Sequence, residues 1–178
     1  MKPKHNRSTA EPPDHELHWL AIDLNLTTLP QTLPDLLERA QRTSLSYSDF
    51  ALSLLRTEWQ ARRERRLTRG LKRSRLGTID GLDNFDFSVR SQLEPRIVKE
   101  LLNCRFVEEN RNIICVGKPG LGKTRIAKAL AHAACLKGYS TLFITVIEML
   151  EELHASLADG SFKRTLGRYT KPSVLVAD

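Results

Sequence analysis

The spacing of apolar positions divides the chain into a helical N-terminal half and a C-terminal half in which helices alternate with short strands. In the first half, apolar residues recur at helical intervals and predict helices over residues 16–25, after Pro34 and from Ser46 onward. Ser46 and Asp49 resemble a capping box at the start of the third helix. Its expected apolar face, including the core, consists of Phe50, Leu54, Leu55 and Trp59.

In the second half, short apolar runs predict three buried strands, over residues 112–116, 141–145 and 173–178. Helices are expected over 92–103, 125–137, 147–157 and 162–169. This order indicates an α/β fold with a parallel sheet. The predicted organisation is a disordered tail (1–15), a helical N-terminal domain with a basic helix (16–75), a linker (76–91) and a P-loop domain (92–178).

The segment from Gly117 to Thr124 fits the pattern G-x-x-x-x-G-K-[ST] and lies between a predicted strand and a predicted helix. Glycines let the backbone turn tightly, so that its N–H groups face phosphate oxygens at the start of a helix. Lys123 is expected to reach the β- and γ-phosphates, and the Thr124 hydroxyl to bind Mg²⁺. The predicted nucleotide-binding residues are Gly117, Pro119, Gly120, Leu121, Gly122, Lys123 and Thr124.

Asp178 ends the third predicted strand and resembles a Walker B aspartate, which holds Mg²⁺ from the end of a neighbouring strand. The alternative interpretation is an ordinary buried strand that ends in a polar residue. The cofactors expected from this pair of motifs are ATP and Mg²⁺. No catalytic residue is assigned.

Positive charge is concentrated in one short stretch. The run from Arg62 to Arg75 has a net charge of +7, which equals the net charge of the whole chain. Such a run predicts sequence-nonspecific DNA binding through the phosphates, whereas the alternatives are a solvated helix or an oligomer contact. The predicted DNA-binding residues are Arg62, Arg63, Arg65, Arg66, Arg69, Lys72, Arg73 and Arg75. Base stacking is not expected, because Trp59 is assigned to the core.

Composition limits the class of protein further. With 40% hydrophobic and 28% charged residues, the chain is typical of soluble globular proteins. No apolar run is long enough to span a membrane, and the N-terminus is not a secretory signal. Cys104, Cys115 and Cys135 are expected to be reduced, buried thiols of a cytoplasmic protein.

The C-terminal half of the chain resembles the IstB family, the AAA+ helper ATPases encoded beside the transposase in some bacterial insertion sequences. The resemblance rests on residues 117–127 and 154–161 in the C-terminal half. Upstream, residues 45–50, 58–63 and 84–87 are similar to the family's N-terminal region. DnaC-type helicase loaders share the ATPase core and are the alternative family.

The resemblance implies an ATP-dependent protein that assembles on DNA, with a homo-oligomer possible, and helps a transposase encoded by the same element. The resemblance also implies that family members continue past this aspartate with further strands, a sensor residue and an arginine finger. Since the sequence ends at Asp178, the chain is expected to be an N-terminal fragment of such a protein. We therefore expect a partial AAA+-like P-loop domain with a gap in its sheet, and an ATPase deficient in hydrolysis. A non-catalytic DNA-binding helical module with a vestigial ATPase is the alternative.

Overall fold

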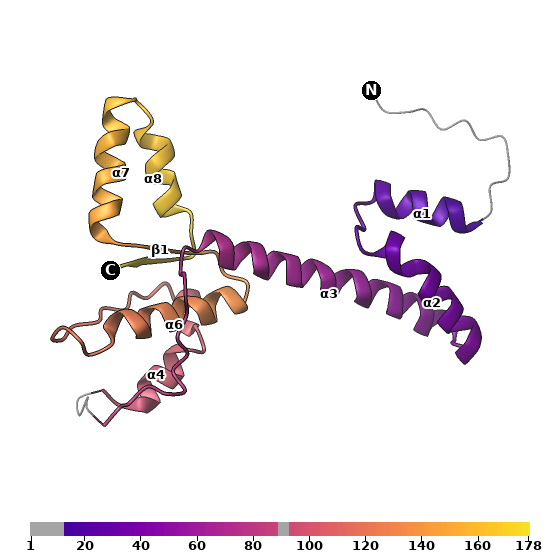
Figure 1. The fold of residues 1–178 in the computed structure, drawn as a ribbon, viewed down its shortest axis with the longest axis horizontal. Coiled ribbons are helices and arrows are strands. Elements are labelled where there is room, and N and C mark those ends of the chain that lie inside the picture. The colour runs from indigo at the N-terminus through magenta and orange to yellow at the C-terminus, as the bar shows by residue number, and fades with distance from the viewer. Residues whose placement is uncertain (1–12, 89–92) are drawn as a thin grey trace. The chain divides into compact units, whose positions relative to one another are not determined.

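A computed structural model describes residues 13–88 and 93–178 of the chain. The elements are α1 (Pro13–Asp23), α2 (Leu29–Thr43), α3 (Tyr47–Arg73), α4 (Pro95–Leu101), α5 (Arg105–Glu108), α6 (Lys123–Leu136), β1 (Thr141–Ile144), α7 (Val146–Ala158), α8 (Phe162–Thr170) and β2 (Val174–Ala177) (Figure 1). The chain divides into two compact units, Met1–Arg65 and Arg66–Asp178, so the boundary falls within α3. Most of the predicted disordered tail, residues 1–12, lies outside the described residues.

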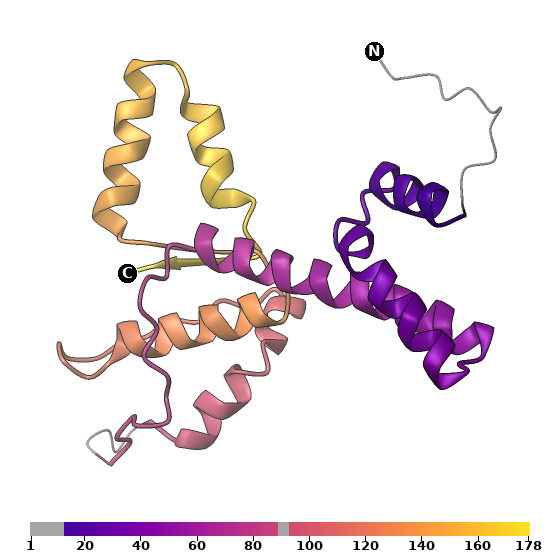
Figure 2. The same ribbon diagram turned by 45° about the vertical axis from the view of Figure 1, so that its right-hand side comes forward.

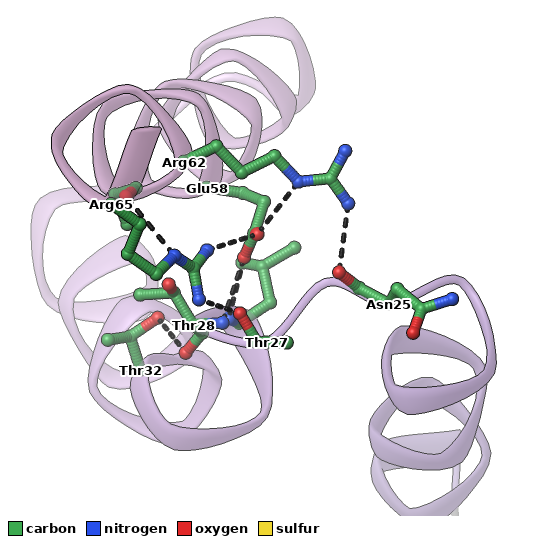
Figure 3. A network of polar contacts seen from close by, with 9 residues as sticks. Asn25, Thr27, Thr28, Thr32, Glu58, Arg62 and Arg65 are labelled. Atoms are coloured by element: carbon green, nitrogen blue, oxygen red, sulfur yellow. Dashed lines mark hydrogen bonds and ion pairs between the residues drawn. The ribbon is translucent and has the colours of Figure 1, made fainter. Parts of the chain in front are cut away.

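In the first unit, a buried carboxylate determines where helix α2 begins. Glu58 is only 4% exposed, and one of its carboxylate oxygens accepts hydrogen bonds from the backbone N–H groups of Thr28 (2.9 Å) and Leu29 (3.3 Å) (Figure 3). The first N–H groups of a helix have no partner within it, and a carboxylate also interacts favourably with the helix dipole there. Helix α2 therefore starts at Leu29, before the predicted start after Pro34, and Pro34 lies inside it.

Helix α3 starts as predicted. The Ser46 hydroxyl donates to the Asp49 carboxylate at 2.6 Å and accepts from the Asp49 N–H at 3.2 Å. The predicted apolar face of this helix is wrong at two positions, because Leu55 is 68% exposed and Trp59 is 59% exposed. The buried residue of α3 is the charged Glu58, since the helix turns this side toward the start of α2.

In the second unit, β1 and β2 form a parallel two-stranded sheet in which Thr141 pairs with Val174 and Ile144 with Ala177. Helices α7 and α8 connect the strands as a helical hairpin, side by side in both views (Figure 2). Thr145 and Glu148 form a capping box that starts α7. The strands and helices predicted over 141–178 are confirmed within one or two residues at their ends.

Helix α6 forms the centre of the second unit. Ile126 and Leu130 pack in a cluster with Phe85 and Val98, and other α6 residues pack in a second cluster with Leu76. The described part of the predicted linker, residues 76–88, thus includes two buried residues that pack against α6. Residues 89–92 of that linker lie outside the described residues.

The strand predicted over residues 112–116 does not form. The segment has no strand pairing in the described chain, and Ile114 and Val116 are 83% and 89% exposed. Strand β2 pairs with β1 along one edge, and no described strand pairs with its other edge. A strand needs hydrogen-bond partners for its backbone, so apolar sequence alone does not make one here. The structure is therefore mixed helix and strand with a small parallel sheet, consistent with a partial P-loop domain. None of the described helices has the length and apolar character needed to cross a membrane.

We predict that Glu58→Gln destabilises the first unit by about 2 kcal/mol, because it removes the charge that the α2 amides and two arginines share. Burial alone would raise the pKa of Glu58, but the Thr28 and Leu29 amides, with Arg62 and Arg65, lower it below its ordinary value. When the pKa of a carboxyl group is lower in the folded state than in the unfolded state, ionisation of the group stabilises the folded state at neutral pH. This contribution is lost as the pH falls through the folded-state pKa.

The measurement is urea unfolding followed by tryptophan fluorescence, since both tryptophans, Trp19 and Trp59, lie in the first unit. The difference in the free energy of unfolding between wild type and Glu58→Gln should be largest at pH 7 and should decrease at acidic pH. Glu64→Gln, at an exposed position of the same helix, is the control and should change stability by less than about 0.5 kcal/mol. Equal stability of wild type and Glu58→Gln at pH 7 would refute the role of Glu58.

Candidate nucleotide-binding site and basic helix

The loop before α6 has a backbone that depends on glycine. Gly120 and Gly122 have φ angles of 79° and 80°, in the left-handed region that side chains rarely adopt. At Gly117, an added Cβ would lie 3.3 Å from the Leu121 side chain. Gly122 is also the residue from which α6 starts, so the loop runs directly into the positive end of this helix.

Lys123 folds back across this loop. Its Nζ donates hydrogen bonds to the backbone oxygens of Gly117 (2.9 Å) and Lys118 (3.0 Å). The ammonium group thus lies over the loop that the sequence predicts to enclose phosphates. This brings the first two residues of the motif within hydrogen-bond distance of the Lys123 ammonium group.

The side chains of Thr124 and Asp178 meet although 54 positions separate them. The Thr124 hydroxyl lies 2.9 and 3.0 Å from the two Asp178 carboxylate oxygens. Asp178 is held there by its backbone, because its N–H donates to the Ile144 oxygen (3.1 Å) and its oxygen accepts from the Val146 N–H (2.9 Å). The pairing of β2 with β1 therefore positions this carboxylate beside the first turn of α6.

Residues before the P-loop domain also contribute to the surroundings of the loop. A pocket of about 400 Å³ is lined by Thr78 and Asp80 together with loop residues and Lys128. Arg125 contacts the same segment: its Nε donates to the Gly81 oxygen at 3.1 Å and its guanidinium lies 5.6 Å from the Phe85 ring centroid. Sequence reasoning did not assign Thr78, Asp80, Gly81 or Phe85 to the site, because they precede the motif by 32 to 39 positions and no local pattern links them to it.

A larger groove, of about 680 Å³, lies between the extended segment 112–115 and β2. Apolar residues such as Leu130 and Val176 line it, and Lys123 and Asp178 contribute polar groups. Cys115 lines this groove and is exposed, so its predicted burial is wrong, whereas Cys104 and Cys135 are buried and all three thiols are free.

The described residues contain no group of three or more histidine, cysteine or acidic side chains that could hold a metal. This does not conflict with a Mg²⁺ ion at a P-loop, because Mg²⁺ keeps several waters and takes few protein ligands. A hydroxyl and a carboxylate within 3.0 Å of each other, beside the predicted phosphate-binding loop, are oxygen ligands of the kind that Mg²⁺ prefers.

Three of the predicted DNA-binding arginines make internal ion pairs. Arg62 donates to Glu58 (3.2 Å) and to the Asn25 oxygen (2.8 Å), while Arg65 donates to Glu58 (3.0 Å) and to the Thr27 hydroxyl (Figure 3). Arg75, just after α3, pairs with Glu152 at 3.2 Å. These side chains hold together elements of their own unit, and their charge is partly neutralised.

Glu152, which pairs with Arg75, has further partners that favour its ionised form. A hydrogen bond from the Tyr169 hydroxyl, opposed by desolvation and assisted by Arg75 and Arg168, lowers the pKa of Glu152. Glu152 on α7 therefore links α8 to Arg75, which lies two residues after the end of α3.

The other predicted DNA-binding residues differ among themselves. Arg63 lies over the ring of Trp59, with 5.4 Å from its guanidinium carbon to the ring centroid. Arg69 has an internal interaction. Arg66, Lys72 and Arg73 are exposed, and in the described part of the chain no interaction is recorded for their side chains. The basic run is therefore not one uniform surface.

A family model and individual relatives both match ATP-binding proteins of insertion sequences. The family model of the IstB-like ATP-binding proteins matches residues 20–178. An ATP-binding protein of insertion sequence IS21 from Pseudomonas aeruginosa is 32% identical over 92% of this chain and 62% of its own length. One of insertion sequence IS5376 from Geobacillus stearothermophilus is 30% identical, over 91% of this chain and 64% of its own length.

A third relative, an ATP-binding protein of insertion sequence IS1162 from Pseudomonas fluorescens, is 35% identical over 76% of this chain and 59% of its own length. The chain thus spans less than two thirds of the length of these curated relatives. The family match extends over nearly all of the chain, including the helices before the P-loop. The chain belongs to the family of IstB-like ATP-binding proteins.

Proposed function

We propose that this chain binds ATP with Mg²⁺ at the loop from Gly117 to Thr124. The observation that carries the proposal is the meeting of Thr124 and Asp178 beside a glycine-dependent loop that Lys123 spans. The loop N–H groups and Lys123 would bind the phosphates, whereas Thr124 and Asp178 would hold the ion. A bound Mg²⁺ neutralises charge on the β- and γ-phosphates.

Binding rather than turnover is the proposed activity of the chain. Hydrolysis requires a group that orients or deprotonates water and a cation that stabilises the transferring phosphoryl group. Among the described residues, Asp178 is the carboxylate whose oxygens lie within hydrogen-bond distance of a P-loop side chain, and the role proposed for it is ion binding. The proposed site therefore contains the parts that hold ATP.

DNA association is the second part of the proposal. It is supported by the charge of the run from Arg62 to Arg75 and by the exposure of Arg66, Lys72 and Arg73. Cations of this kind bind the phosphate backbone without reading sequence. Since the relatives are proteins of insertion sequences, the proposed biological role is help to the transposase of the same element.

We predict that Lys123→Ala weakens binding of a fluorescent ATP analogue at least about tenfold, because it removes the charge nearest the β- and γ-phosphates. Lys118→Ala is the matched control, since its side chain lies in the same loop at a position the motif leaves free. Phosphate release should stay at background for wild type, with or without DNA. Turnover that Lys123→Ala abolishes would refute the proposed lack of hydrolysis, and equal binding by both variants would refute the site.

We predict that Asp178→Asn makes ATP binding independent of Mg²⁺. The amide keeps the shape of the carboxylate but loses the negative charge that favours the ion. The measurement is a titration with ATP in Mg²⁺ and in EDTA, for wild type and variant. Wild type should bind more tightly in Mg²⁺, whereas the variant should bind equally in both. An unchanged Mg²⁺ dependence in the variant would remove Asp178 from the ion site.

We predict that replacing Arg66, Lys72 and Arg73 together by Gln reduces the salt dependence of duplex DNA binding. Each lost phosphate contact lowers the slope of log K against log salt by about one. A control variant with the same loss of charge replaces Arg96, Lys99 and Arg105, which are exposed on and beside α4. Equal slopes for the two variants would refute a footprint on α3. If the affinity for duplex DNA is the same with and without ATP, the result would favour a DNA-binding module without nucleotide control.

A further inference from the structure

The exposure of Trp59 is unusual for a large aromatic residue. With 59% of its surface exposed, it leaves much of its ring in water, although tryptophan is normally among the residues with the most to gain from burial. Its position follows from its neighbour, because Glu58 faces the start of α2 and successive residues of a helix point about 100° apart. The helix therefore turns Trp59 away from the contact that holds α2.

Two arginines lie on either side of Trp59 along the same face of α3. Arg56 precedes it by three residues and Arg63 follows it by four, which are the spacings of neighbours on a helix surface. Arg63 lies over the ring, with its guanidinium carbon 5.4 Å from the centroid. We call Arg56, Trp59 and Arg63 the Trp59 ridge. All three belong to the first unit.

Within the described residues, no ion pair neutralises the charge of the Trp59 ridge. Arg56 and Arg63 are both exposed, and the structure records no ion pair for either of them within the described residues. Arg62 and Arg65, in contrast, share the buried Glu58 carboxylate. Glu58 thus pairs with Arg62 and Arg65, whereas no ion pair within the described residues involves Arg56 or Arg63.

An aromatic ring between two available cations matches the chemistry of an unstacked nucleic acid. A base offers a flat face to the ring, and the phosphates on either side of it offer negative charge to the arginines. The exposed Leu55 and Leu52, which lie one turn and two turns before Trp59, would also suit a protein partner. The two unneutralised arginines favour a polyanion, because a mainly apolar protein surface would leave both of them without a counter-charge.

We propose that the Trp59 ridge binds single-stranded or locally unstacked DNA, with Trp59 stacked on a base and Arg56 and Arg63 on the flanking phosphates. This inference rests on the proposed DNA association but uses residues distinct from Arg66, Lys72 and Arg73. It adds a preference for unpaired bases to a footprint that otherwise recognises only phosphates.

The test measures binding of a labelled single-stranded thymidine oligonucleotide and of a fully paired duplex of the same length. Trp59→Ala should weaken single-strand binding about tenfold and duplex binding less, since stacking on an aromatic ring contributes on this scale. Trp59→Phe should retain part of the affinity. Arg56→Gln with Arg63→Gln should lower the salt slope for the single strand.

Matched controls separate stacking from general effects. Tyr47→Ala removes a 96% exposed aromatic residue from the start of the same helix, and Arg39→Gln removes an exposed charge from α2. Neither should change single-strand affinity. In Trp59→Ala, the remaining Trp19 reports on the folding of the first unit by fluorescence, so loss of structure is detected independently.

Each other result contradicts the proposal. Unchanged single-strand binding by folded Trp59→Ala would refute stacking while the proposed duplex footprint stands. Equal losses for single strand and duplex would refute the preference for unpaired bases. If wild type binds neither nucleic acid, both the ridge and the proposed DNA association fail. If Trp59→Ala keeps its DNA affinity but sediments as a smaller species, the ridge is a contact between copies of the chain.

Discussion

The burial of helix α6 is the constraint on which the second unit depends. Ile126 and Leu130 pack in one apolar cluster, and Ala131 and Cys135 pack in another. Its small buried alanines let neighbouring backbone approach closely, as dense packing requires. Because both clusters fix α6, they also fix its N-terminus, which is where the glycine loop ends and where Asp178 approaches. The geometry of the candidate site is thus a consequence of core packing.

In the first unit, Glu58 has the corresponding role. A buried carboxylate is costly unless hydrogen bonds and opposite charges surround it, and the start of α2 together with Arg62 and Arg65 supplies both. The same contact decides which arginines remain available to a partner. A run of positive charge is therefore not equivalent to a binding surface, since part of it neutralises the fold's own buried charge.

The P-loop could be predicted because its residues are contiguous and its glycines are required by backbone conformation alone. The position of Asp178 near this loop could be predicted because it ends an apolar strand 55 residues after Lys123. Sequence reasoning did not find the contact of Arg125 with Gly81, because no local pattern records a contact between residues 44 positions apart. It also assigned Trp59 to the core, since helical periodicity shows that a face is apolar but not what covers it.

The sequence by itself determined the glycine-dependent loop from Gly117 to Thr124, the capped start of α3, and the strands and helices from residue 141 onward, because these depend on neighbouring residues. Only the tertiary structure decided that α2 starts at Leu29, that residues 112–116 remain unpaired, and that Trp59 faces water. Each of these depends on groups distant in sequence: a carboxylate that caps a helix, a strand that offers hydrogen bonds, or a surface that covers a ring. Local patterns do not record whether such a partner is present.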